Sequence, residues 1–142
     1  MEKEQLTFTI QLNASPEKVW DVLWTENTYN QWTKGFNEGS HAVSDWKEGS
    51  EVLFLGDTDD GMYSRIEKKV VPSEMSILHL GEIKQGVRVA SEWGEAYERY
   101  YLTAKNGGTE LRVTLDSVPE FSDYFRETFP KALEVVKKLS EN

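Results

Sequence analysis

The chain has 142 residues, close to the commonest size of a single domain, so we expect residues 1–142 to form one domain. Its 25 acidic and 16 basic residues give a net charge of −9, which disfavours nucleic acid and anionic lipid surfaces as partners. The sequence has no cysteine, no signal-peptide pattern and no apolar run of the roughly 18 residues that cross a bilayer, so we expect a cytosolic protein that is not inserted in a membrane.

The N-terminal part of the chain predicts one strand followed by two short helices. Apolar and polar residues alternate from Leu6 to Leu12, which is typical of a half-buried strand. Ser15 followed by Pro16 is typical of a helix N-terminus, and apolar residues recur at three- and four-residue spacing as far as Trp24. The aromatic-rich segment 25–39 predicts a second short helix and a loop.

The middle of the chain predicts a meander of antiparallel strands. Turn signals follow one another at hairpin spacing between about residue 38 and residue 116. The predicted strands between them lie near residues 41–45, 50–56, 62–71, 75–83, 92–104 and 109–116. The clearest hairpin joins the run that ends at Tyr101 to Leu111, Val113 and Leu115 through the turn Asn106-Gly107-Gly108.

The C-terminal segment returns to helical spacing. Apolar residues form one stripe over residues 121–139, which predicts a long amphipathic helix of about 30 Å. Ser117 and Glu120 have the spacing of a capping box, and Ser122 is an alternative N-cap. Pro130 lies within the stripe, where it removes one backbone donor, so we expect a kink close to it.

Motifs for metal binding and nucleotide chemistry fail on inspection. The segment Asp57–Gly61 resembles a calcium loop, but Met62 stands where the loop glycine belongs and Lys68 where a bidentate glutamate belongs. We interpret this segment as a solvated hairpin turn. His41 and His79 lie far apart on predicted strands without carboxylates arranged around them. We expect no metal ion and no cofactor, and the chain shows no recognisable catalytic set.

Glu98 and His79 are the polar residues that need an explanation. If Leu102 faces the core, the alternation of a strand turns Glu98 and Tyr100 inward as well. A buried carboxylate is costly unless it is paired or protonated, so an inward Glu98 indicates an internal ion pair or a ligand contact. The alternative is an edge strand or a bulge that leaves Glu98 in water. His79 is either a hydrogen-bonded or exposed strand histidine or an acid–base group.

The five tryptophans allow two interpretations. They fill a core that is modest in aliphatic content, or they line a small-molecule pocket, because such pockets use aromatic walls with few polar groups. The sequence leaves both interpretations open. The residues concerned are Trp20, Trp24, Trp32, Trp46 and Trp93.

Several segments, in this order and spacing, carry a family resemblance. Among them are Ala14-Ser15-Pro16-Glu17-Lys18-Val19-Trp20, Trp46-Lys47-Glu48-Gly49-Ser50, Leu78-His79-Leu80-Gly81-Glu82-Ile83 and Phe129-Pro130-Lys131-Ala132-Leu133. The chain resembles the helix-grip (SRPBCC) superfamily of START-related and birch-pollen-allergen-like proteins, and within it the branch named after the activator of heat-shock protein 90 ATPase homologue. The resemblance implies an α+β domain in which a curved antiparallel sheet wraps around a long C-terminal helix. It also implies two short helices after the first strand and an internal cavity.

Three functions remain open, because this superfamily includes lipid carriers, hormone receptors and polyketide cyclases. The favoured one is binding of a small hydrophobic or amphipathic molecule, lipid-like or aromatic, between the sheet and the C-terminal helix. The residues expected to surround this ligand are Trp20, Trp24, Trp32, Phe36, Phe54, His79, Trp93, Glu98, Tyr100, Phe125 and Phe129.

The second function is a stress-related interaction with a chaperone or another protein, through an exposed apolar patch near Trp32, Phe36 and Trp46. The third is a cyclase or hydrolase that uses the same cavity, with Glu98 or His79 as the acid or base. A function without catalysis is favoured over the third.

Overall fold

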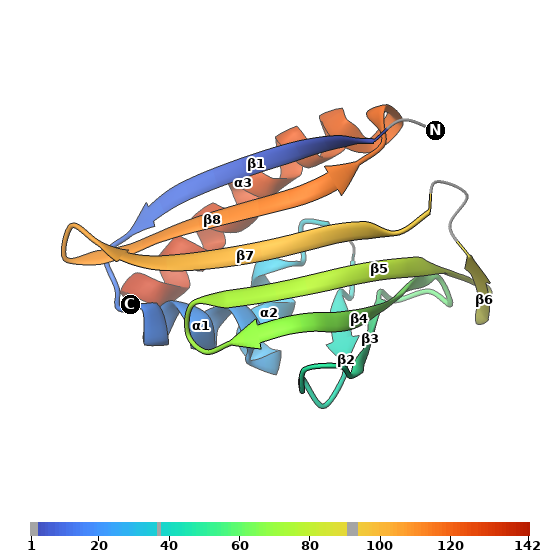
Figure 1. The fold of residues 1–142 in the computed structure, drawn as a ribbon, viewed down its shortest axis with the longest axis horizontal. Helices are drawn as coiled ribbons and strands as arrows, with labels where there is room; N and C mark the ends of the chain where they lie inside the picture. The colour runs from blue at the N-terminus through green and yellow to red at the C-terminus, as the bar shows by residue number, and fades with distance from the viewer. Residues whose placement is uncertain (1–2, 37, 91–93) are drawn as a thin grey trace.

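The structure is a computed structural model that describes residues 3–36, 38–90 and 94–142. Most of the described chain is in strands and helices (Figure 1). These elements are β1 (Glu4–Leu12), α1 (Pro16–Trp24), α2 (Glu26–Trp32), β2 (His41–Val43), β3 (Glu51–Leu55), β4 (Gly61–Val70), β5 (Glu74–Lys84), β6 (Val87–Ala90), β7 (Ala96–Lys105), β8 (Gly108–Ser117) and α3 (Pro119–Glu141).

The strands form one antiparallel sheet in the order β1-β8-β7-β5-β4-β3-β2, with β6 paired to β5 off this path. The hairpin that the sequence predicts most clearly is confirmed, because Glu98 lies opposite Leu115 and Leu102 lies opposite Leu111. Asn106 has a φ of 53° and Gly107 a φ of 78°, and a two-residue type I′ turn requires positive values at both positions. The meander interpretation therefore holds across the sheet.

β6 is a strand that the sequence pattern did not predict. All of its four residues are exposed, so it has no buried face and no alternation of apolar and polar positions. The strand predicted near residues 92–104 begins at Ala96, and residues 91–93 lie outside the described part of the chain.

One face of the sheet and the three helices enclose the apolar core. β8 contributes Leu111 and Val113, α1 contributes Leu23, and α3 contributes Leu133 and Val136, all of them at most 2% exposed. Figure 1 shows α3 running along β1 and β8 over much of their length, with α1 and α2 following β1 in the chain. This is the predicted α+β helix-grip arrangement, in which an antiparallel sheet wraps around a long C-terminal helix.

Of the predicted helix N-caps, Ser15 at α1 is confirmed, whereas Ser117 and Ser122 at α3 are wrong. Ser15 caps α1, because its Oγ accepts a hydrogen bond of 3.2 Å from the Lys18 N–H. At α3 the N-cap residue is Val118 instead, and no side chain caps this end. The hydroxyls of Ser117 and Ser122 both donate to the carbonyl oxygen of Val118, and neither forms the capping hydrogen bond with a backbone N–H of the first turn.

Pro130 does not end α3. The helix continues through it to Glu141, for 23 residues in all. The kink expected at this proline stays a prediction.

Candidate functional site

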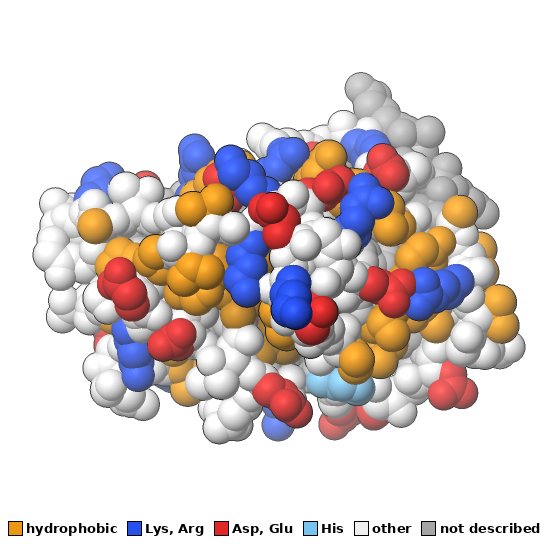
Figure 2. Space-filling view, turned by 60° about the horizontal axis from the view of Figure 1, so that its bottom comes forward, with side chains coloured by type: hydrophobic (Ala, Val, Ile, Leu, Met, Phe, Trp, Pro, Cys, Tyr) orange, Lys and Arg blue, Asp and Glu red, His pale blue; other side chains and the backbone are white. Residues whose placement is uncertain are grey.

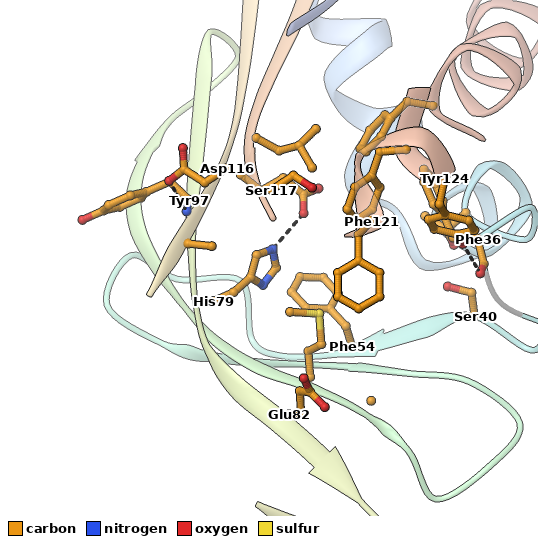
Figure 3. Close-up of a pocket in the computed structure, with 18 of the residues that line it drawn as sticks. Phe36, Ser40, Phe54, His79, Glu82, Tyr97, Asp116, Ser117, Phe121 and Tyr124 are labelled. Atoms are coloured by element: carbon orange, nitrogen blue, oxygen red, sulfur yellow. Dashed lines mark hydrogen bonds and ion pairs between the residues drawn. The ribbon is translucent and has the colours of Figure 1, made fainter. Parts of the chain in front are cut away.

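A pocket with a volume of about 460 Å³ lies between the sheet and the N-terminal half of α3. Its walls come from β3, β4, β5, β7 and β8, from α2 with the segment after it, and from α3 (Figure 3). Small-molecule sites in proteins typically have volumes of about 300–1,000 Å³. The pocket is therefore large enough for a molecule of several fused or linked rings.

Eight of the eleven residues expected around a ligand line this pocket. Its aromatic members are Trp32, Phe36, Phe54, Tyr100, Phe125 and Phe129, and its polar members are His79 and Glu98. The ring of Phe129 lies 4.8 Å from that of Phe36 and 6.1 Å from that of Phe125, centroid to centroid. These contacts join α3 to the segment that follows α2, so the aromatic wall is also part of the packing.

The tryptophans of α1, Trp20 and Trp24, are not among the residues that line the pocket. Trp20 is 7% exposed, and Trp24 packs edge to face against Tyr100 with ring centroids 4.9 Å apart. Both side chains belong to the core behind the pocket wall. Trp32 is the tryptophan that reaches the pocket, and Trp93 lies outside the described residues.

Glu98 points inward, and its carboxylate is paired. It lies on β7, between β5 and β8, so the alternative of an edge strand is wrong. His79 Nε2 lies 2.8 Å from Glu98 Oε1, and the Tyr100 hydroxyl donates to Glu98 Oε2. Ser64 Oγ lies 2.7 Å from His79 Nδ1 on the other side of the imidazole. A chain of hydrogen bonds thus runs from fully buried Ser64 through His79 to a carboxylate at the pocket wall.

The hydrogen bonds at Glu98 keep its carboxyl group ionised. Burial alone raises the pKa of Glu98, but the hydrogen bond and the charge of His79, and then the hydrogen bond from Tyr100, outweigh burial and hold this pKa below its ordinary value of 4.5. Burial, followed by the negative charge of Glu98, raises the pKa of Tyr100 well above 10. Both effects favour a carboxylate that accepts and a tyrosine that donates.

The hydrogen bonds also fix how His79 can act. Because a carboxylate only accepts, His79 must donate its Nε2–H to Glu98. Its Nδ1 is occupied by the hydroxyl of Ser64, which can donate to it or accept from it. Ser64 is fully buried, so a substrate has no access to its hydroxyl and it is not a nucleophile. The group left to interact with a bound molecule is the carboxylate of Glu98.

A β-bulge brings a second carboxylate, Glu82, to the pocket wall. Ser64 pairs with His79, but Tyr63 pairs with Gly81, so Leu80 is an extra residue on β5. The extra residue reverses the alternation, and Glu82 reaches the face that His79 occupies. Strict alternation from His79 would place it outside. A glycine within a strand pattern, as here at Gly81, is a sequence signal for such a bulge.

Two aromatic residues of α3 that the sequence analysis did not select lie at the pocket. Phe121 is 44% exposed and Tyr124 is 43% exposed, and both line the pocket. The Tyr124 hydroxyl donates to the carbonyl oxygen of Phe36 over 2.6 Å, which ties the start of α3 to the segment after α2 (Figure 3). Partly exposed side chains on the wall indicate that this is the open side of the pocket.

The three rings around which an exposed apolar patch was expected, those of Trp32, Phe36 and Trp46, are themselves buried or partly buried. Trp32 is 2% exposed, and its indole N–H donates to the carbonyl oxygen of Leu23 over 3.1 Å. Phe36 and Trp46 are partly buried and pack against the core. Because these three rings pack against the core, they do not themselves form an exposed docking surface.

Other kinds of site find little support in the described residues. Residues 57–60 form the turn between β3 and β4, as predicted. No group of three or more potential metal ligands occurs in residues 3–36, 38–90 and 94–142. No helix of the described chain is long and apolar enough to cross a membrane. On the face drawn in Figure 2, basic and acidic side chains are interspersed, without the continuous basic field that nucleic acid binding requires.

Several solved structures share this fold over nearly the whole chain. An Aha1 dimer from Colwellia psychrerythraea has a TM-score of 0.77 and 18% identity, and the match covers 97% of this chain and 96% of that chain. A protein from Cytophaga hutchinsonii has a TM-score of 0.73 and 24% identity, over 97% and 94% of the two chains. CalU16 from Micromonospora echinospora has a TM-score of 0.68 and 14% identity, over 98% and 86%. At these identities the likeness establishes the fold alone.

No curated protein matches this chain. A family model does match it, over residues 13–140. Because this match spans most of the 142 residues, the chain belongs to the family described as Activator of Hsp90 ATPase homolog 1-like protein.

Proposed function

We propose that this protein binds a small, largely apolar molecule in the pocket beneath the N-terminal half of α3. The observation that carries the proposal is a space of about 460 Å³ with an aromatic lining. Such walls favour apolar guests, because each 100 Å² of apolar surface removed from water contributes about 2.5 kcal/mol. The family's fold is compatible with ligand binding and with partner binding, and the pocket favours the former.

A neutral apolar dye, N-phenyl-1-naphthylamine, provides a direct test. We expect its fluorescence to rise on titration with the protein and to saturate at one dye per chain. Ala96→Leu places a larger side chain at a position that is 2% exposed and lines the pocket, so the affinity for the dye is expected to fall about tenfold or more.

The matched control is Val87→Ala on β6. Val87 is 64% exposed and does not line the pocket, so this variant is expected to bind the dye as the unchanged protein does. A linear, unsaturable titration would contradict the proposal. Equal losses in the two variants would contradict it as well, because they would place the dye elsewhere.

Acid–base catalysis in the same pocket is the second candidate, because His79 and Glu98 converge at the pocket wall, with Nε2 and Oε1 2.8 Å apart. It ranks lower, because both nitrogens of His79 are already hydrogen-bonded to Glu98 and Ser64. Mass spectrometry of the molecule recovered after prolonged incubation separates the two. A binding protein returns its ligand unchanged, whereas an enzyme returns a product.

A further inference from the structure

We propose that the pocket selects an amphipathic molecule whose polar end is a protonated amine and that Glu98 binds this amine, a specificity that rests on the proposed function. Three observations carry it: the charges of the pocket wall, the hydrogen-bonding capacity left on Glu98, and the aromatic rings around it.

The charged groups of the pocket wall are predominantly acidic. The side chains of Glu82 and Glu98 line it, whereas that of Asp116 alternates with inward-facing Leu115 and turns to the other face, and no lysine or arginine of the described chain lines it. Lys84 is the cation nearest to Glu82, with 3.4 Å between Nζ and Oε2, but its side chain is 63% exposed and its effect is screened by water. Apart from His79, whose Nε2 is already paired with Glu98, the charged side chains of the described wall are acidic, so the wall favours cations over anions.

The side-chain donors at the pocket are largely engaged by protein acceptors. The indole N–H of Trp32 and the hydroxyls of Thr33, Tyr100, Ser117 and Tyr124 all donate within the protein. His79 gives its Nε2–H to Glu98, and its Nδ1 is occupied by Ser64. The hydroxyls that remain in the lining belong to Tyr29 and Ser40 and are uncharged, because the Tyr97 side chain points away from the pocket and its ring lies under Arg99 (Figure 3). A carboxylate or phosphate group would thus find no cationic donor with a free N–H.

Glu98 still has room for a donor. A carboxylate has about four acceptor positions on its two oxygens, and the structure fills one on Oε1 through His79 and one on Oε2 through Tyr100. The side chain is 22% exposed and lines the pocket, so the remaining positions are accessible from it. An ammonium group brings several N–H donors and a compensating charge, and hydrogen bonds between ionised groups are about twice as strong as neutral ones.

The rings around the His79–Glu98 pair suit the same group. Tyr100 donates to Glu98, Phe54 lies 5.6 Å from His79 between ring centroids, and Tyr29 lies 6.5 Å from Phe54. The faces of aromatic rings attract cations, and this attraction is strongest where water is excluded. A carboxylate flanked by aromatic rings is thus matched to an ammonium on an apolar body.

Three probes that share one apolar body test this assignment: 2-naphthylmethylamine, 2-naphthalenemethanol and 2-naphthoate, titrated calorimetrically into the full chain at pH 7. We expect the amine to bind at least tenfold more tightly than the naphthoate and more tightly than the alcohol. If the naphthoate binds as tightly as the amine, the inference is overturned while the proposed function stands. If none of the three binds, both are overturned.

Two variants locate the preference. Glu98→Gln keeps the shape of the side chain and removes its charge, so we expect the amine to lose about tenfold in affinity and the alcohol much less. Glu74→Gln is the matched control, because the Glu74 side chain is also 22% exposed and ion-paired but lies outside the pocket lining. An unchanged preference in Glu98→Gln would overturn the role of Glu98. The comparison of probes on the unchanged protein does not depend on either variant.

Discussion

The space beneath α3 is filled at one end and hollow at the other. Under the C-terminal half of the helix, Leu12, Leu23, Leu111 and Val136 are fully buried and form a closely packed core. Under the N-terminal half, the same sheet and the same helix enclose a pocket of about 460 Å³. One helix and one sheet thus provide both a core and a candidate binding site.

The side chains explain the difference between the two ends. Branched aliphatic side chains interdigitate and fill volume, as they do at the C-terminal end of the helix. At the N-terminal end, Phe129 stacks on Phe8 but meets Phe36 edge to face and Phe125 at a tilt, and such stiff rings fill an irregular space less completely than branched aliphatic side chains do. The hydrogen-bonded pair His79 and Glu98 adds polar groups that apolar side chains cannot cover without cost.

The largest expected effect is the loss of a side chain from the filled end. Leu111→Ala leaves a cavity at a fully buried position, so we expect the free energy of unfolding to fall by roughly 2–5 kcal/mol. Phe125→Ala enlarges a space that already exists, because Phe125 is only partly buried and lines the pocket, so its cost is expected to be about 1 kcal/mol. Urea titrations followed by tryptophan fluorescence measure both, and equal losses would contradict the contrast.

The next effect comes from adding volume at both ends. Ala132→Leu inserts atoms into the packed core at a position that is 4% exposed, so it is expected to cost about 1–3 kcal/mol. Ala96→Leu extends toward the pocket, so the free energy of unfolding is expected to change by less than about 1 kcal/mol. Differential scanning calorimetry compares the two. A large loss in Ala96→Leu would mean that the space beside it is not accessible to a side chain.

Most of the fold could be predicted from patterns local in the sequence. The alternation in β1, the Ser15-Pro16 start of α1 and the Asn106-Gly107 turn each report a local preference, and the structure agrees with all three. β6 and the start of α3 could not be predicted in the same way. β6 has no buried face, and the hydroxyls near Val118 are engaged at its carbonyl oxygen instead of capping the helix.

Of the candidate site, only the inward orientation of Glu98 could be predicted, because it depends on the register of the β7–β8 hairpin alone. The alternation that places Leu102 in the core also turns Glu98 inward, so its orientation could be inferred. Its partner could not, because the pair with His79 requires β5 and β7 to be neighbours in the sheet. Glu82 was missed because the bulge at Leu80 reverses the alternation of β5. Trp20 and Trp24 lie in or against the core and not in the pocket lining, because helical spacing does not distinguish a core from a pocket wall.

The smallest expected effect is a difference in acid stability at the hollow end. The pKa of Glu98 in the folded protein lies below its ordinary value of 4.5, which it has in the unfolded chain. At a pH in the window between these two pKa values, the unfolded chain therefore binds more protons at Glu98 than the folded protein does. The stability contributed by the ionised carboxylate is therefore complete well above pH 4.5 and is lost as the pH falls through that window. We expect the urea midpoint of the unchanged protein to fall more steeply than that of Glu98→Gln as the pH falls below about 5, through that window. Both proteins share the other carboxylates with lowered pKa values, Glu4, Asp45 and Glu141, so their difference isolates Glu98. Parallel pH profiles would mean that the hydrogen bonds from His79 and Tyr100 do not stabilise the ionised form.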